Sequence, residues 1–176
     1  MHLAITALSQ SPTHFIADIL EAVTHCHCNI LELRSTHLEK SAIAAYLLVE
    51  GNWNHLAKLE SILNSLQKRL NVQIHTQQTK TLNLKKPYIT YKLETISINQ
   101  QNITQDIITF LSTRNILIDE IKASCRPDYT TQTSIFSSYF ILLIPVDIQL
   151  SVLREEILNF CDDFNLDAIF EPVKYL

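Results

Sequence analysis

One order of hydrophobic periodicities occurs twice along this chain, and it limits the possible folds more than any other feature. Alternation of apolar and polar residues predicts a half-buried strand, whereas apolar residues three or four positions apart predict an amphipathic helix. The first copy contains, in chain order, a strand at 3–8, a helix at 15–23, strands at 29–38 and 43–49, a helix at 53–66 and a strand at 72–79. The predicted order is β-α-β-β-α-β.

The second copy follows the same plan. It contains a strand at 89–94, a helix at 103–111, a strand from residue 116, a polar hairpin at 126–134, an apolar strand at 139–144, a helix at 150–158 and a strand at 166–173. Two short echoes link the copies: Asn-Ile-Leu at 29–31 and 115–117, and Glu-Ser-Ile-Leu at 60–63 against Glu-Glu-Ile-Leu at 155–158. We therefore predict one domain at 1–80, a linker at 81–87 and a second domain at 88–176.

Each copy predicts a ferredoxin-like unit, which belongs to the α+β class. In that topology a four-stranded antiparallel sheet carries both helices on one face, and its first and third strands are central. The third strand is the most apolar strand in each copy. Its apolar residues stand at successive positions, so both faces of the sheet should be covered. Because the helices cover one face, the other face needs a partner sheet or a second subunit.

The glycine content excludes several enzyme classes. The chain has one glycine, Gly51. The dinucleotide-binding fingerprint, the P-loop and the nucleophile elbow each need several glycines, because the backbone must approach a phosphate or turn sharply. Most nucleotide-dependent enzymes and esterases are therefore excluded.

Charge and hydropathy predict a soluble, cytoplasmic protein. Lys and Arg number 14 against 18 Asp and Glu, the net charge is −4, and the basic residues are scattered. A protein that binds DNA directly normally concentrates positive charge on one face. No uninterrupted apolar run reaches the length that spans a membrane, and the first residues lack the pattern of a signal peptide. The four cysteines are accordingly expected to be reduced thiols.

Polar residues precede each of the four predicted helices and suggest N-terminal caps. Asn, Ser and Asp favour that position because their side chains accept hydrogen bonds from the first free amides. The predicted caps are Ser11 (followed by Pro12), Asn52, Asn102 (in a capping box with Gln105) and Asp147. Trp53, at the start of the second helix, is expected to lie in the core.

The stretch His25-Cys26-His27-Cys28-Asn29-Ile30 looks like a metal site with four consecutive ligands. Consecutive extended residues point to opposite sides, so the four side chains cannot converge on one tetrahedral metal. At most Cys26 and Cys28 share a face, and two ligands are insufficient. We therefore expect no metal, two buried thiols and a left-handed backbone at His27, where a helix-ending glycine would be natural.

Three segments carry a resemblance to a known family. They are "LAITAL" at 3–8, "HCHCNI" at 25–30, where the family has Cys-Gly-Cys-Asn-Ile, and "VEGNWN" at 49–54 ahead of a Leu-rich helix. The chain resembles the ACT-domain proteins and, more closely, the glycine cleavage system transcriptional repressor family of two tandem ACT domains. The resemblance covers nearly the whole chain. It implies a non-enzymatic regulatory protein that senses an amino acid, glycine being the first expectation, and acts through a partner transcription factor.

The resemblance also implies where a ligand would bind. Ligands of such modules usually sit between the first strand and the first helix, at a loop of the type Asp-Arg-Pro-Gly, which here reads Ser-Pro-Thr-His at 11–14. The asparagine that opens the second strand matches a ligand-contacting position, and its counterpart in the second copy is taken as Asn115. We expect the candidate residues to converge in two groups: Ser11, His14 and Asn29 in the first copy, and Ser97, Asn99 and Asn115 in the second.

Two other functions stay open. One is a dimerisation or interaction module without ligand binding, which the loss of the loop's acidic residue and glycine favours. The other is an enzyme on the ferredoxin-like fold, although no nucleophile–base pair or metal quartet supports it. We expect no cofactor.

The second strand of each copy should lie at a sheet edge. We therefore expect a homodimer, or an intramolecular pair of modules, that contacts a transcription factor rather than DNA.

Overall fold

The chain falls into two compact units, Met1–Asn83 and Leu84–Leu176. The computed structural model describes residues 1–176 except 11–13, 39–41, 81–86, 99–101, 128–132 and 174–176. The first unit contains β1 (His2–Ser9), α1 (Phe15–His25), β2 (Asn29–Leu38), β3 (Ala42–Glu50), α2 (Trp53–Leu70) and β4 (Gln73–Thr79). The second contains β5 (Tyr88–Ile98), α3 (Ile103–Thr113), β6 (Leu117–Pro127), β7 (Ser134–Pro145), α4 (Leu150–Asp163) and β8 (Asp167–Pro172).

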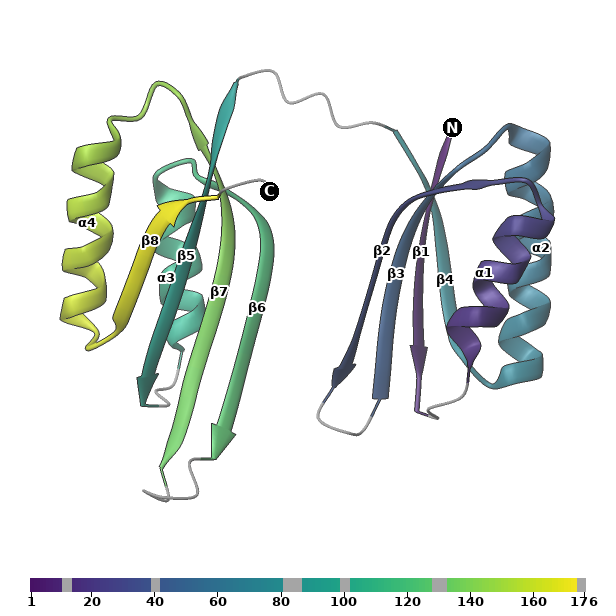
Figure 1. The fold of residues 1–176 in the computed structure, drawn as a ribbon, viewed down its shortest axis with the longest axis horizontal. Helices are drawn as coiled ribbons and strands as arrows, with labels where there is room; N and C mark the ends of the chain where they lie inside the picture. The colour runs from purple at the N-terminus through teal and green to yellow at the C-terminus, as the bar shows by residue number, and fades with distance from the viewer. Residues whose placement is uncertain (11–13, 39–41, 81–86, 99–101, 128–132, 174–176) are drawn as a thin grey trace. The chain divides into compact units, whose positions relative to one another are not determined.

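Both units have the predicted βαββαβ order and the α+β fold, with two helices on one face of an antiparallel sheet (Figure 1). The strand orders are β2-β3-β1-β4 and β6-β7-β5-β8. The first and third strands of each unit are therefore central, and the second strand lies at an edge, as predicted. The predicted linker at 81–87 falls almost wholly outside the described residues, so the domain boundaries stay a prediction.

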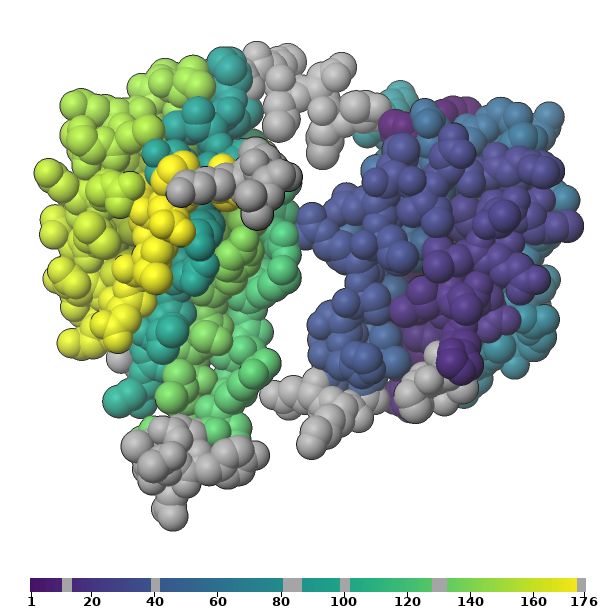
Figure 2. All heavy atoms as spheres, viewed as in Figure 1, coloured from purple at the N-terminus to yellow at the C-terminus, as the bar shows by residue number. Residues whose placement is uncertain are grey.

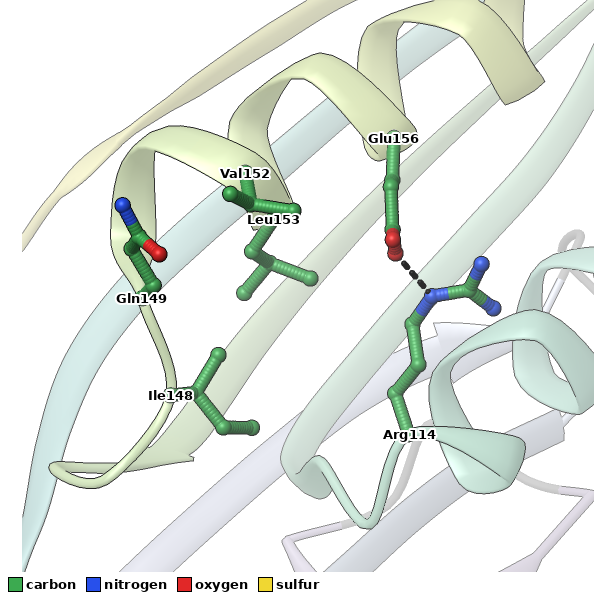
Figure 3. Close-up of a pocket in the computed structure, with 6 residues that line it drawn as sticks. All are labelled: Arg114, Ile148, Gln149, Val152, Leu153 and Glu156. Atoms are coloured by element: carbon green, nitrogen blue, oxygen red, sulfur yellow. Dashed lines mark hydrogen bonds and ion pairs between the residues drawn. The ribbon is translucent and has the colours of Figure 1, made fainter.

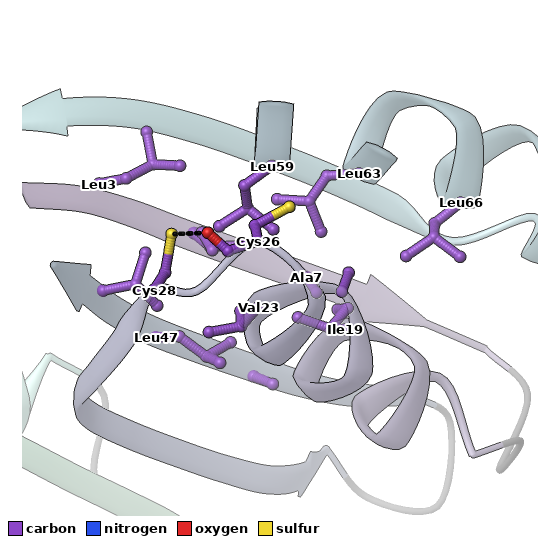
Figure 4. Close-up of a cluster of buried hydrophobic side chains, with 14 of the residues drawn as sticks. Leu3, Ala7, Ile19, Val23, Cys26, Cys28, Leu47, Leu59, Leu63 and Leu66 are labelled. Atoms are coloured by element: carbon purple, nitrogen blue, oxygen red, sulfur yellow. Dashed lines mark hydrogen bonds between the residues drawn. The ribbon is translucent and has the colours of Figure 1, made fainter. Parts of the chain in front are cut away.

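The core of the first unit lies between its sheet and its helices. On β1 every second residue is buried, at Leu3, Ile5 and Ala7, because alternate side chains of a strand share one face. The helices bury one stripe each: Phe15, Ile19, Ala22 and Val23 from α1, and Leu56, Leu59, Leu63 and Leu66 from α2. Figure 4 shows Ile19 and Val23 facing Leu59 and Leu63 across this core. Figure 2 shows the outer surface of the described residues, beneath which these core side chains lie buried. Each fully buried leucine contributes about 1.5–3 kcal/mol.

The face of the sheet opposite the helices is not closed within the first unit. The Tyr46 side chain on β3 points to that face and is 42% exposed. The apolar third strand predicts that both faces of the sheet are covered, but the first unit itself covers only the face that carries its helices. That a partner sheet or a second subunit covers the other face stays a prediction.

Three helices end in the same hydrogen-bonded turn. After α1 the residue in the left-handed region is His27 (φ 52°), after α3 it is Asn115 (φ 57°), and after α4 it is Asn165 (φ 52°). In α1 the His27 amide donates to Thr24 O at 3.0 Å, and the next amide donates to Val23 O at 3.1 Å. This is the Schellman arrangement, which satisfies the last free carbonyls. The prediction of a left-handed His27 is confirmed.

The helix starts agree less well with the sequence. Asn52 is the one predicted cap that is confirmed, since its Oδ1 accepts from the His55 amide at 2.8 Å. Asn102 has a left-handed backbone (φ 67°) and makes no capping bond, so the predicted capping box is wrong. Helix α4 begins after Gln149 rather than Asp147. Ser11 lies outside the described residues, and His14 occupies the cap position of α1 instead.

Trp53 is not a core residue. Its side chain is 64% exposed, which contradicts the prediction. The reason is its place in α2: it is the first helical residue, and the buried leucine stripe begins only at Leu56.

Candidate functional site

The residues 25–30 form no ligand cluster. Cys26 and Cys28 point into the core of the first unit, as predicted (Figure 4), and Cys28 Sγ lies 3.7 Å from the Cys26 carbonyl oxygen. Burial raises the pKa of both thiols. His25 and His27, by contrast, face the solvent. In the part of the chain that the structure describes, no group of three or more His, Cys, Asp or Glu side chains could hold a metal ion.

The predicted convergence in the first unit is wrong. His14 precedes α1 and is exposed, whereas Asn29 follows the same helix. Because α1 has 11 residues, its two ends lie about 16 Å apart. The sheet register agrees, since Asn29 and His2 both pair with Glu50, at the end of β1 remote from His14. Ser11, the third member of the group, lies outside the described residues.

The second unit repeats this separation. Ser97 stands near the end of β5 and ahead of α3, whereas Asn115 stands just after α3, which also has 11 residues. Asn99 lies outside the described residues. The position of Asn115 and its left-handed backbone fit the turn that ends α3, where its amide donates to Ser112 O at 3.0 Å.

Asn115 is also not the counterpart of Asn29. It is the second residue after α3 and has a positive φ, as His27 has after α1. The bulges in β2 and β6 lead to the same pairing: they fall after Ile30 and after Ile118, so Asn29 corresponds to Leu117. The two Asn-Ile-Leu segments, at 29–31 and 115–117, therefore do not occupy equivalent positions in the two units.

A polar position recurs at the end of the first strand in both units. Ser9 and Ser97 each stand six residues before the helix that follows, and each side chain is buried on the helix side of the sheet. Ser97 Oγ has no hydrogen-bond partner among the described residues. Its neighbour on the same face, Thr95, is satisfied, since its hydroxyl lies 2.6 Å from Ser138 Oγ. Sequence reasoning selected Ser97 and missed Ser9, although alternation along β1 places it on the buried face.

Among the described residues, no side-chain cap is found at the starts of the two helices that follow these serines. Neither His14 before α1 nor Asn102 before α3 makes a capping hydrogen bond, whereas Asn52 caps α2. The first amides of an uncapped helix carry partial positive charge and can donate to an anion. Each of these two helices therefore begins with amide donors six residues after a buried serine hydroxyl, and such amides suit a small carboxylate.

The first unit matches a known protein family by sequence. Residues 2–77 match the family model described as ACT domain. The first unit is therefore similar to an ACT domain, and the second unit repeats the same βαββαβ order and strand arrangement. No curated protein matches the sequence significantly.

Two solved structures resemble the chain over its whole length. One is reported as a candidate glycine cleavage system transcriptional repressor; it is 18% identical, has a TM-score of 0.75, and the match covers 99% of this chain and 98% of that one. The other is an unknown protein from Galdieria sulphuraria, 16% identical with a TM-score of 0.76, covering 98% of each chain. At these identities the likeness establishes the shared tandem fold.

Among the helices that the structure describes, none is both long and apolar enough to cross a membrane.

Proposed function

We propose that this protein is a non-enzymatic regulator that binds a small amino acid, glycine first, and acts through a partner transcription factor. The ACT-domain match of the first unit supports the proposal, together with the repetition of its fold in the second unit and the full-length likeness in fold to a candidate glycine cleavage system repressor. The acidic net charge of −4 favours action by protein contact over a direct grip on DNA. A cytoplasmic homodimer remains our expectation.

The observation that carries the ligand proposal is the Ser97 hydroxyl. A buried polar group without a partner costs about 1–3 kcal/mol, so such groups are rare unless something else satisfies them. We place the amino-acid carboxylate at the start of α3, where Asn102 makes no capping bond, within reach of Ser97 and with Asn99 as a further candidate. Ser9 and His14 mark the corresponding end of the first unit. Asn29 and Asn115 are left out of these groups, because they lie at the opposite ends of α1 and α3.

The chemistry of the thiols supports the non-enzymatic part of the proposal. Catalytic cysteines are accessible thiolates with lowered pKa values. Here burial raises the pKa of Cys26, Cys28 and Cys161. These groups suit packing better than nucleophilic attack.

The second candidate function is an interaction module that has lost its ligand. The edge strand β2 favours it, because four of its apolar side chains are at least 40% exposed: Ile30, Leu31, Leu33 and Leu38. An edge strand with exposed apolar side chains is a ready site for pairing with another strand. The two candidates differ in whether an amino acid binds.

A thermal-shift screen of the full chain against the common amino acids, glycine first, separates the two candidates. Ligand binding raises apparent stability by about 2.7 kcal/mol at a hundredfold excess over the dissociation constant. The proposal expects a concentration-dependent rise in Tm that disappears in Ser97→Ala.

Ser124→Ala is the matched control, because its hydroxyl pairs with Ser137 on the other face of the sheet. That variant should keep the response. If no amino acid changes the Tm of the unmodified chain, the interaction module is the better description.

A further inference from the structure

Four basic side chains gather at one corner of the first unit, where α1 ends and α2 begins. The Lys58 Nζ and His25 Nε2 atoms lie 3.4 Å apart, and the ring centres of His27 and His55 lie 5.9 Å apart. His55 and Lys58 stand three positions apart on α2, so they are neighbours on one face of that helix. The two pairs therefore form one patch, which we call the basic corner.

The basic corner has no carboxylate partner. Among the described residues, none of its four side chains forms an ion pair with Asp or Glu. Two carboxylates stand near it in the sequence. Glu21 lies one turn before His25 on α1, and Glu50, the last residue of β3, lies 3.6 Å from His2 instead. No direct contact with an acidic side chain therefore neutralises the Lys58 ammonium.

The equivalent corner of the second unit is built differently (Figure 3). There Arg114, which follows α3, donates from Nε to Glu156 Oε2 of α4 at 2.6 Å, so the cation has a carboxylate partner. When the units are aligned on the left-handed residues that follow their helices, Arg114 corresponds to Cys26 and Glu156 to Ile62. The first unit thus carries basic groups at this corner without the glutamate.

The backbone at His27 indicates that its imidazole serves more than the turn. Of the five positive-φ residues in the described part of the chain, only His27 is not an asparagine; the others are Asn71, Asn102, Asn115 and Asn165. Asparagine visits this conformation readily because its short polar side chain bonds locally, and glycine adopts it without strain. A conformation that costs free energy is kept where the side chain serves a site. Here it brings the His27 ring beside His55.

The charge of this corner depends on pH. All seven histidines of the chain lie in the first unit, and three of them belong to the basic corner. Histidine gains charge between pH 8 and pH 5, whereas ammonium groups and carboxylates such as Lys58, Glu21 and Glu50 keep theirs over most of that range. Burial raises the pKa of the Cys26 and Cys28 thiols, which therefore stay uncharged. Acidification thus makes the corner more cationic.

We propose that the basic corner binds a phosphate group and that protonation of its histidines strengthens this binding. The Lys58 ammonium and the ring N–H groups of His27 and His55 donate to the phosphate oxygens. A phosphate dianion offers several strong acceptors at once, which suits donors that come from two segments of the chain. A carboxylate has one charge and two oxygens, so it would use fewer of these donors.

This site goes beyond the proposed function in place and in ligand class. It follows α1, whereas Ser9 and His14 precede that helix, whose 11 residues span about 16 Å. Its ligand is a phosphate group rather than an amino acid.

NMR titration of the full chain with inorganic phosphate tests the proposal. The ionic strength is held constant with sodium chloride, so that screening does not change. We expect saturable shifts of the His27 and His55 ring signals and of the amides at 25–28 and 52–58. Glycerol 3-phosphate is titrated in parallel. Tighter binding of this ester would assign the site to phosphorylated metabolites, and tighter binding of inorganic phosphate would assign it to the free ion; either result supports the proposal.

Sulfate separates the titration of the protein from that of the ligand, because sulfate stays a dianion between pH 8 and pH 6. Its affinity should rise about tenfold as the pH falls over this range, since each protonated histidine makes a stronger, charge-assisted hydrogen bond. A sulfate affinity that does not change with pH would overturn the proposed role of the histidines.

Two variants test the named residues. Lys58→Gln removes the permanent charge, and His27→Asn removes the imidazole but keeps a residue that suits the left-handed turn. Each should weaken phosphate binding about tenfold. Lys68→Gln is the matched control for the first variant, because Lys68 is exposed and lies about 15 Å further along the same helix. His75→Gln, an exposed position on β4, is the control for the second.

The proposal is overturned if neither inorganic phosphate nor glycerol 3-phosphate binds saturably, or if Lys58→Gln and His27→Asn both bind phosphate as well as the unmodified chain. It is also overturned if Lys68→Gln weakens binding as much as Lys58→Gln. General attraction to a positive surface would then account for the binding.

Discussion

At the scale of single residues, two buried side chains on β5 show that burial alone does not tell whether a polar group has a hydrogen-bond partner. Thr95 and Ser97 are both buried on the helix side of the sheet. Thr95 shares a 2.6 Å hydrogen bond with Ser138, whereas Ser97 Oγ has no partner among the described residues. The sequence indicates which face each residue occupies, because alternation fixes it. It does not indicate the partner across the strand, which depends on register.

This difference predicts opposite effects of two conservative substitutions. Thr95→Val leaves the buried Ser138 hydroxyl unpaired and should lower the free energy of unfolding by about 1–3 kcal/mol. Ser97→Ala removes a hydroxyl that has no partner and should be neutral or slightly stabilising without ligand. Urea unfolding of both variants checks this. Equal destabilisation by the two changes would show that Ser97 is satisfied in solution.

Gly51 gives a second prediction at this scale. A Cβ atom at this position would lie 3.0 Å from Cys28 Sγ and 3.2 Å from Leu56 Cδ2. Gly51→Ala should therefore destabilise the first unit by about 1 kcal/mol or more through overpacking. Combining it with Cys28→Ala should cost less than the sum of the two single changes, because the nearest contact is gone. Additive costs in denaturant unfolding would argue against this contact.

Cys161 gives a pH-dependent prediction. Burial raises the pKa of its thiol to about 11 from an ordinary value of 9.0. The unfolded chain therefore loses this proton first as the pH rises, so stability is complete below pH 9 and falls between about pH 9 and 11. Each unit of pKa difference corresponds to about 1.4 kcal/mol. Cys161→Ala should flatten this slope in unfolding experiments at several pH values, and an unchanged slope would assign it to other groups.

At the scale of secondary structure, the spacing of apolar residues predicts the helices and strands well. The residues that precede and cap each helix are predicted poorly. The stripes of α1 and α2 mark buried faces, so their existence could be read directly. A cap depends on where the backbone enters the helix, and nearby polar residues compete for that role. Gln149 rather than Asp147 therefore precedes α4, and Asn102 takes a left-handed backbone that prevents its predicted capping bond. Trp53 was misplaced for a related reason, since it precedes the buried stripe.

The helix ends give a testable prediction. His27 holds φ at 52°, which costs a residue with a Cβ about 1–2 kcal/mol relative to glycine. His27→Gly should therefore stabilise the first unit by about 1 kcal/mol, as measured by its unfolding midpoint. Asn29→Gly is the control: this residue lies in β2, so glycine there should destabilise. A destabilised His27→Gly protein would mean that contacts of the imidazole, such as its packing near His55, outweigh the backbone term.

At the scale of the whole molecule, the repeated order of elements was enough to predict the tandem fold. The short sequence echoes were less reliable: Asn115 corresponds to His27, and Leu63 in α2 corresponds to Ile157 rather than Leu158. The Arg114–Glu156 pair could not be predicted, because Arg114 follows α3, Glu156 lies in α4, and no local spacing connects them. The predicted convergence of the candidate ligand residues is wrong for a similar reason: each group combines residues before and after one helix, and these lie at opposite ends of that helix.

Hydrogen exchange of the full chain with and without millimolar glycine tests the central claim, that an amino acid binds at the starts of α3 and α1. Bound ligand should slow exchange of the first amides of α3, around Ile103, or of α1, around Phe15, and Ser97→Ala should abolish the effect in α3. The start of α2 serves as an internal reference, because it follows Glu50 at the end of β1 remote from Ser9 and carries its own cap at Asn52. Unchanged exchange at both helix starts, with glycine and with every other common amino acid, would contradict the claim.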